Sequence, residues 1–258
     1  MAAGVYPVDI AIPSLPPARF LLSRLDGRTE AAIAPERPGM ATRVLAALAA
    51  TREGEPLRPA TLPVAVHDRL LAAIYRAEIG ETVACRAACA ACAKPFEFAF
   101  PLAALIARQD EAAAAVGPPD SEGWWTAPGG FQLRVPTLAD TEAGDGAALL
   151  ARIARKKLPK SRIDAAAAFL EEASPLLSLD IATSCPECGH GQKVWFDLAI
   201  FLIRTLAGER PFLLREAHLL AARYGWSHGE IMALPRDDRR AFAALIESER
   251  SAAMRRAS

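Results

Sequence analysis

The sequence predicts an α+β fold in which two Cys-x-x-Cys hairpins form a small antiparallel ribbon, helices pack around it, and the C-terminal part is all helical. The pairs Cys89–Cys92 and Cys185–Cys188 each lie between segments in which apolar and polar residues alternate. Alternation with a period of two on both sides of a tight turn is typical of a β-hairpin. From residue 205 onward, apolar residues recur instead at helical spacing.

Composition limits the class of protein. The chain has 258 residues, and its 30 Lys and Arg residues balance its 30 Asp and Glu residues. A neutral chain gives no general reason to expect a nucleic acid or an anionic membrane as partner. The most apolar run, Val194–Ile203, is shorter than the ~20 residues of a membrane span, and no secretory signal is visible at the N-terminus. We therefore expect a soluble, intracellular protein.

The two cysteine pairs belong to an internal repeat, whose two copies align without a gap. When Cys92 is aligned with Cys188, the strand positions that follow match in apolar character, and so does the start of the next helix. The matching pairs are Phe98 with Val194, Phe100 with Phe196, Leu102 with Leu198 and Ile106 with Leu202; before the turns, Val83, Cys85 and Ala87 match Leu179, Ile181 and Thr183. Each half therefore predicts a strand, a cysteine turn, a second strand and the start of a helix.

Two such hairpins predict a zinc ribbon. Each turn presents two thiolates, and docking of the two turns completes a tetrahedral site for Zn²⁺. The predicted ligands are Cys89, Cys92, Cys185 and Cys188. Catalytic zinc sites usually keep an open position, whereas four thiolates close the shell, so the predicted role of the ion is structural. The alternative is a site that has lost its metal and keeps four packed thiols.

Two further residues near the turns leave alternatives open. Cys85 aligns with Ile181 at an inward strand position, which favours a small buried hydrophobic residue over a fifth ligand. His190 follows Cys188 by two residues and either donates to a thiolate, faces solvent or takes part in the metal site. An odd number of cysteines in two clusters fits metal binding better than a disulfide framework.

The rest of the chain is divided around the two turns. Helices are predicted over Met40–Thr51, Val66–Gly80 with Asp68 as N-cap, Leu102–Val116, Ala147–Lys157 and Ser161–Glu172. The predicted segments are 1–60 (a Pro-rich start, then strand and helix), 61–106 (helix and first knuckle), 107–175 (a mainly helical insertion), 176–204 (second knuckle) and 205–258 (C-terminal helices).

One stretch of the insertion is strongly basic. Six Lys and Arg residues lie within Arg152–Arg162. A solvated helix end, with cations in its last turn, is one interpretation. A patch for phosphate or for an acidic partner is the other.

The C-terminal part predicts helices with a short turn between them. Leu213, Leu214, Ala217, Leu220, Ala221 and Tyr224 form one apolar stripe, and Phe242, Leu245 and Ile246 form another. Ser227 and Glu230 form a capping box. A helix-turn-helix reader of DNA is disfavoured, because the short second helix is mostly apolar and Asp237 and Asp238 follow it. No phosphate-binding glycine loop, nucleophile elbow or zinc-protease motif is present in the sequence, so we expect no enzyme and no small-molecule substrate.

The segment HLLAARYGWSHGEIMALPRDDRR, residues 218–240, resembles the ending of baseplate, or tail hub assembly, proteins of tailed phages and contractile injection systems. The segments around both cysteine turns and RVPTLAD resemble that family as well, so the resemblance spans residues 20–245. It implies a non-enzymatic structural or assembly protein in a prokaryotic cytoplasm, either free or incorporated in a phage-like particle. The partners that it implies are baseplate, tail hub or spike proteins. The motif positions, and hence the implied partner-binding residues, are Tyr224, Trp226, Glu230, Ile231 and Leu234.

Three functional hypotheses follow. The first is an assembly module of a contractile tail. The second is a zinc-ribbon protein that binds nucleic acid, which depends on the ribbon and on the basic stretch Arg152–Arg162. The third is an enzyme whose site has no recognisable motif.

Overall fold

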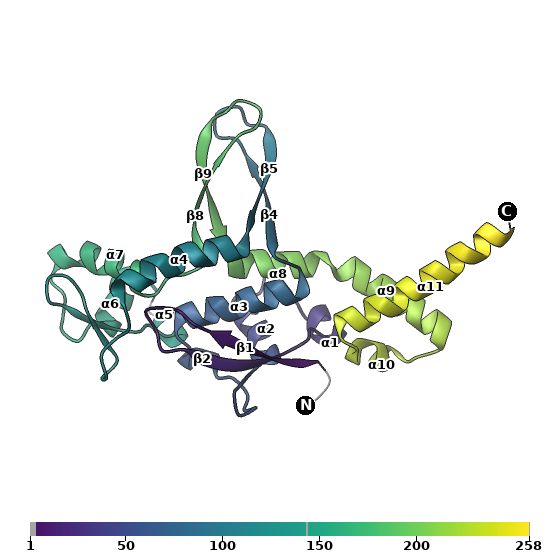
Figure 1. Ribbon diagram of the computed structural model, residues 1–258, viewed down its shortest axis with the longest axis horizontal. Helices are drawn as coiled ribbons and strands as arrows, with labels where there is room; N and C mark the ends of the chain where they lie inside the picture. The colour runs from purple at the N-terminus through teal and green to yellow at the C-terminus, as the bar shows by residue number, and fades with distance from the viewer. Residues whose placement is uncertain (1–3, 143, 258) are drawn as a thin grey trace.

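The computed structural model of the chain combines helices with small antiparallel sheets (Figure 1). It describes residues 4–142 and 144–257. Residues 1–3, 143 and 258, which belong to the predicted segments 1–60, 107–175 and 205–258, lie outside the described part. The strands are β1 (Val5–Ile10), β2 (Ala18–Ser23), β3 (Ala49–Thr51), β4 (Thr82–Ala88), β5 (Pro95–Pro101), β6 (Trp124–Thr126), β7 (Gln132–Arg134), β8 (Ser178–Ser184) and β9 (Gly191–Asp197). The helices are α1 (Gly27–Ala31), α2 (Met40–Leu48), α3 (Val64–Glu78), α4 (Leu102–Val116), α5 (Leu138–Thr141), α6 (Gly146–Ile153), α7 (Ile163–Ala173), α8 (Leu198–Gly208), α9 (Arg210–Tyr224), α10 (His228–Ala233) and α11 (Arg236–Ala257). Single 3₁₀ turns span Pro59–Thr61 and Lys160–Arg162.

A three-stranded antiparallel sheet, in the order β1-β2-β3, forms the N-terminal layer. Pro7 is tolerated in β1 because this strand lies at the edge of the sheet. The predicted helix Met40–Thr51 ends early: α2 stops at Leu48, and the following residues pair with β2 as β3. Backbone pairing in the sheet therefore overrides the helical preference of this alanine-rich segment.

Helix α3 is the centre of the main core. Leu70, Leu71 and Ile74 are fully buried among residues of the N-terminal sheet, α2 and α8. The predicted N-cap Asp68 was wrong, because the helix begins at Val64, directly after a proline. The carboxylate of Asp68 instead accepts a hydrogen bond of 2.9 Å from the backbone N–H of Leu177, just before β8.

The two cysteine hairpins project together from the helical body, with their tips side by side (Figure 1). In the first hairpin Cys85 lies opposite Phe98, and in the second Ile181 lies opposite Val194. The strands and their register agree with the repeat that the sequence predicts. Each second strand runs directly into a helix, α4 or α8.

The repeat continues into the helices. The N–H of Leu102 donates to the carbonyl of Glu81, and at the same offset the N–H of Leu198 donates to the carbonyl of Leu177. The helix before each hairpin packs against the helix that follows the other one, since α3 contacts α8 and α7 contacts α4. The two halves thus cross and hold each other at the base of the hairpins.

The segment 107–175 contains the end of α4, the small β6–β7 hairpin and helices α5 to α7. It has a small core of its own, in which Leu133, Leu150, Ile153 and Ala166 are buried. Trp125 is also buried and packs against Phe169, so it anchors its strand.

The C-terminal helices α9 to α11 form a helical unit, and the end of α11 extends away from the body (Figure 1). The predicted apolar stripes are partly wrong, because Leu214 and Leu245 are exposed. The face that packs against the body carries charged side chains instead, with Glu216, Arg236 and Arg239 buried. Among the described residues, no helix has the length and apolar character that crossing a membrane requires.

Candidate metal centre

Both cysteine turns have the same backbone geometry. The N–H of Cys89 donates to the carbonyl of Lys94, and the N–H of Cys185 donates to the carbonyl of His190, each at 2.9 Å. Inside each turn the residue after the second cysteine donates back to the first, from Ala93 in one turn and Gly189 in the other. The residue that donates this bond has a left-handed backbone in both turns, with φ of 58° at Ala93 and 74° at Gly189.

The turns bring four sulfur atoms together. The Sγ atoms of Cys89, Cys92, Cys185 and Cys188 all lie within 4.8 Å of one another. Across the two turns, Cys89 Sγ lies 3.6 Å from Cys188 Sγ, and Cys92 Sγ lies 3.8 Å from Cys185 Sγ. A Zn–S bond of about 2.3 Å in a regular tetrahedron requires sulfurs about 3.8 Å apart, so this set of donors could hold a metal ion and is compatible with zinc.

The cluster is half protected from water. Cys89 and Cys185 are buried, with 3% and 1% of their surfaces exposed, and the ring of Phe96 packs beside them. Cys188 is exposed, and Cys92 is half-buried. The first cysteine of each turn therefore faces the interior of the paired hairpins, whereas the second lies toward the surface.

Backbone donors favour the thiolate form of Cys89. The N–H groups of Cys92 and Ala91 lie 3.5 and 3.4 Å from Cys89 Sγ. Chiefly because of the hydrogen bond from Cys92, together with that from Ala91, the pKa of Cys89 falls to about 6. At Cys188 a backbone hydrogen bond from His190 lowers the pKa, but hydrogen bonds with the neighbouring cysteines, together with burial, raise it on balance to about 12. His190 thus contacts the thiol through its backbone.

Cys85 lies apart from the four-cysteine group. It is half-buried in β4 and packs against the main core, as the inward strand position predicts. Burial raises the pKa of its thiol, which is the expected behaviour of a structural cysteine.

A side-chain clamp that the sequence did not suggest joins the two turns. The amide of Gln192 donates to the carbonyl of Ala88 at 3.1 Å and accepts from the N–H of Ala90 at 2.8 Å. An ion pair of 2.7 Å between Lys94 and Glu187 spans the same gap. In the repeat alignment Gln192 corresponds to Phe96. This mismatch between a polar and an aromatic residue was the only sign in the sequence that Gln192 has a separate role.

The residues singled out in the C-terminal segment lie together in the helical unit. Trp226 stacks on Tyr224, with ring centroids 4.9 Å apart, and Ile231 is fully buried. Glu230 and the Ser227 hydroxyl form the predicted capping box. The carbonyl of Leu234 accepts from Arg239 at 2.8 Å. Each of these residues has a contact within the fold.

A network of buried charges, which the sequence did not predict, surrounds Arg236 and Arg239. Arg239 has no exposed surface and donates to Glu30 of α1 and to Glu216 of α9. Arg236 donates to Glu209 at 2.7 Å and to the carbonyl of Glu78 at 3.2 Å. These bonds join the C-terminal unit to the body, and the two arginines at helical spacing in PRDDRR were their only sequence signal.

Other chains give no guide to the role of these features. No protein-family model, no curated protein and no solved structure matches this chain. A pair of cysteine turns is a local geometry that can occur on unrelated folds, so it indicates a capacity to bind metal and does not indicate a family.

Proposed function

We propose that the two hairpins form a zinc ribbon in which Cys89, Cys92, Cys185 and Cys188 bind one structural Zn²⁺. The observation that carries this proposal is the spacing of 3.6 and 3.8 Å between sulfurs of opposite turns. Bound zinc would supply a cross-link between segments that are distant in sequence. Four thiolates fill a tetrahedral shell and leave no position for water or substrate, which supports a structural role over a catalytic one.

We further propose that the chain is a non-enzymatic structural or assembly protein of a phage-like contractile tail baseplate. The proposal depends on the resemblance of residues 218–240 to that family. It is supported by the shape of the molecule, because paired hairpins and the end of α11 both project from the body and offer surfaces for protein contacts (Figure 1). The proposed partners are baseplate, tail hub or spike proteins.

Deletion of the gene tests this function in a host that makes contractile tails. We expect electron micrographs of the deletion strain to lack complete baseplates, and expression of the full chain to restore them. The chain with Cys89→Ser should restore them poorly if the zinc ribbon is needed for assembly. Normal tails in the deletion strain would contradict the assembly function.

The second candidate is a nucleic-acid-binding protein, which one observation favours. Arg155, Lys156, Lys157 and Arg162 line a pocket of about 280 Å³ together with the Gly129–Gly130 turn. Arg162 donates to the carbonyl of Gly129, a neutral acceptor, at 2.7 Å and forms no ion pair with a described residue. Lysines and arginines that contact phosphates give an affinity that falls steeply with salt.

Binding of duplex DNA and single-stranded RNA at low and high salt tests this second candidate. We expect the paired substitution Lys156→Ala with Lys157→Ala to weaken binding and reduce its salt dependence. Arg58→Ala, at an exposed site outside the pocket, serves as the control. Equal binding by both variants would remove the candidate.

A further inference from the structure

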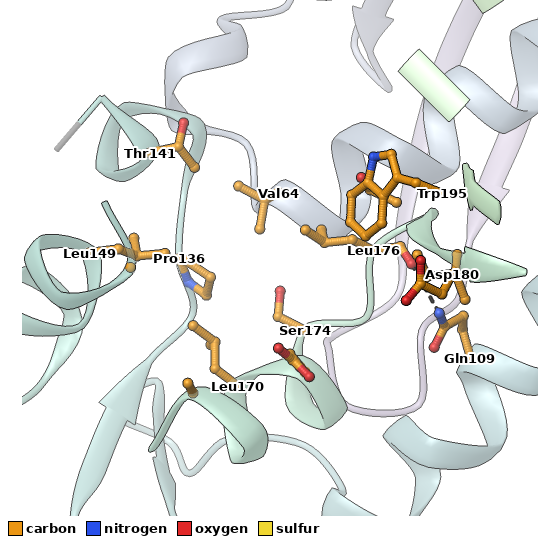
Figure 2. Close-up of a pocket in the computed structure, with 15 residues that line it drawn as sticks. Val64, Gln109, Pro136, Thr141, Leu149, Leu170, Ser174, Leu176, Asp180 and Trp195 are labelled. Carbon is orange, nitrogen blue, oxygen red and sulfur yellow. Dashed lines mark hydrogen bonds between the residues drawn. The ribbon is translucent and has the colours of Figure 1, made fainter. Parts of the chain in front are cut away.

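A cleft separates the insertion from the base of the second cysteine hairpin (Figure 2). Its volume is about 670 Å³, which lies in the range of ~300–1,000 Å³ typical of ligand sites. Its walls come from α3 to α7 and the hairpin β8–β9. The lining is mainly apolar and includes Val64, Pro136, Leu149, Leu170, Leu176 and Trp195.

Trp195 is the first sign that the cleft binds something. Its side chain borders the cleft, yet 64% of the residue is exposed to solvent. The repeat supplies an internal comparison, because the equivalent position in the first hairpin is Ala99, also in an antiparallel pair. A cysteine hairpin of this kind therefore folds without an aromatic residue at this site, and the indole is available for an interaction outside the fold.

Ser174 is the second sign. Only 3% of the residue is exposed, and its hydroxyl has no hydrogen-bond partner among the described residues. Figure 2 shows the hydroxyl pointing toward the space between Val64, Pro136 and Leu170. A buried hydroxyl without a partner is unfavourable by about 1–3 kcal/mol, and a polar group of a bound molecule would remove this cost.

Charge at the rim of the cleft indicates what it binds. The carboxylates of Glu171 and Asp180 line the cleft, are exposed, and form no ion pair within the described residues. The lining as described contains neither Lys nor Arg. The equivalent of Asp180 in the first hairpin is Ala84, so this carboxylate too is additional to what the hairpin needs. The rim is therefore complementary to a cation.

We propose that this cleft is a docking site for a protein partner that inserts a bulky apolar side chain and places an adjacent Lys or Arg beside Glu171 and Asp180. The indole of Trp195 covers the apolar side chain, and the hydroxyl of Ser174 bonds to a polar group of the inserted segment. The choice of a protein partner rests on the proposed assembly function. The partner surface then lies at the cysteine hairpin and the insertion, away from the motif residues of the segment 224–234.

Peptide binding by the purified full-length chain tests the proposal. A phage-displayed library of random peptides is selected against the chain, and synthetic versions of the enriched peptides are titrated by fluorescence polarisation. We expect an apolar residue next to Lys or Arg in the enriched sequences. Trp195→Ala should weaken binding about 30-fold, as expected for an aromatic anchor, and Glu171→Gln should weaken it several-fold. Ser174→Ala should weaken binding without lowering thermal stability.

The repeat provides matched controls. Trp195→Ala and Asp180→Ala place in the second hairpin the residues that the first hairpin already has, so both variants should fold. Arg86→Ala, on the outer face of the first hairpin, should leave peptide affinity unchanged. The proposal is overturned by enrichment of acidic peptides, by absence of enrichment, or by binding that is indifferent to Trp195→Ala.

Sedimentation of the chain without peptide tests whether a second copy of the chain occupies the cleft. A dimer that Trp195→Ala abolishes would identify a second copy of the chain in the cleft and would also overturn the proposal. These measurements need no phage particle. Failure of the tail-assembly test with intact peptide binding would reject the assembly function alone, and the reverse pattern would reject the cleft alone.

Discussion

The two cysteine hairpins present their thiols in one register but differ in the residues that support it. The second hairpin has Gly189 at the left-handed position of its turn, whereas the first has Ala93. At the base of the second hairpin Asp197 caps α8, while the first has Pro101, which has no side-chain acceptor to offer α4. The features that the two hairpins share are therefore the ones that the sulfur cluster requires. The second hairpin has the residues better suited to its backbone, because it has a glycine at the left-handed position and a side-chain cap on its helix.

Loss of a cysteine should have the largest effect and should be equal in the two halves. Cys89→Ser and Cys185→Ser each remove one buried thiolate, so zinc content should fall from about one ion per chain to near zero. Structural zinc contributes roughly 10–16 kcal/mol in isolated fingers. The main core around α3 does not contain the four clustered cysteines, so we expect local unfolding of the hairpins.

Elemental analysis and amide hydrogen exchange check this prediction. Protection should disappear from β4, β5, β8 and β9 in both variants and persist in α3. Cys85→Ser, which changes a thiol outside the cluster, is the control and should retain zinc. Retention of zinc by Cys89→Ser would show that the two turns do not share one ion.

How much of this arrangement the sequence could reveal depends on the range of the interactions. The strand register and the four-cysteine set follow from residue spacing that is local to each turn. Both could be predicted by aligning Cys92 with Cys188. The pairing of β3 with β2 and the carboxylate of Asp68 on Leu177 are contacts between distant segments. Local propensity carries no information on such partners, and buried arginines such as Arg239 look like solvated ones in a sequence.

Removal of the N-terminal cap of α8 should have the next largest effect on stability. Asp197 accepts hydrogen bonds from the N–H of Ile200 at 2.8 Å and from the hydroxyl of Ser178 at 2.9 Å. Asp197→Ala removes both acceptors and should lower the free energy of unfolding by about 1–2 kcal/mol. Pro101→Ala, the matched change at the base of the first hairpin, removes no acceptor and should cost only about 0.5 kcal/mol.

Urea denaturation of both variants in excess zinc measures this difference. Equal losses of stability would mean that the asymmetry between the two helix starts has no energetic consequence. A larger loss for Pro101→Ala would reverse the comparison.

Exchanging the residues at the left-handed positions should have smaller and opposite effects. Gly189→Ala forces a side chain into a backbone conformation that costs about 1 kcal/mol, although a Cβ there meets no other described atom within 4 Å. Ala93→Gly relieves the same strain in the first turn and should raise stability by about 0.5 kcal/mol after the entropy of the unfolded chain is considered. Thermal unfolding of the two variants should shift in opposite directions, and shifts of the same sign would show that the turns are not equivalent.

The smallest effect on stability is expected on the outer face of the hairpins. Trp195 is mostly exposed and replaces an alanine of the first hairpin, so Trp195→Ala should change the free energy of unfolding by less than about 0.5 kcal/mol. A loss above 1 kcal/mol, a large value for a surface change, would mean that the indole supports the fold. An exposed residue that differs between the two hairpins and contributes little to folding is free to make the contact that the proposed docking requires. Thermal unfolding of Trp195→Ala therefore tests whether the indole contributes to folding, and the peptide titration tests whether it contributes to binding.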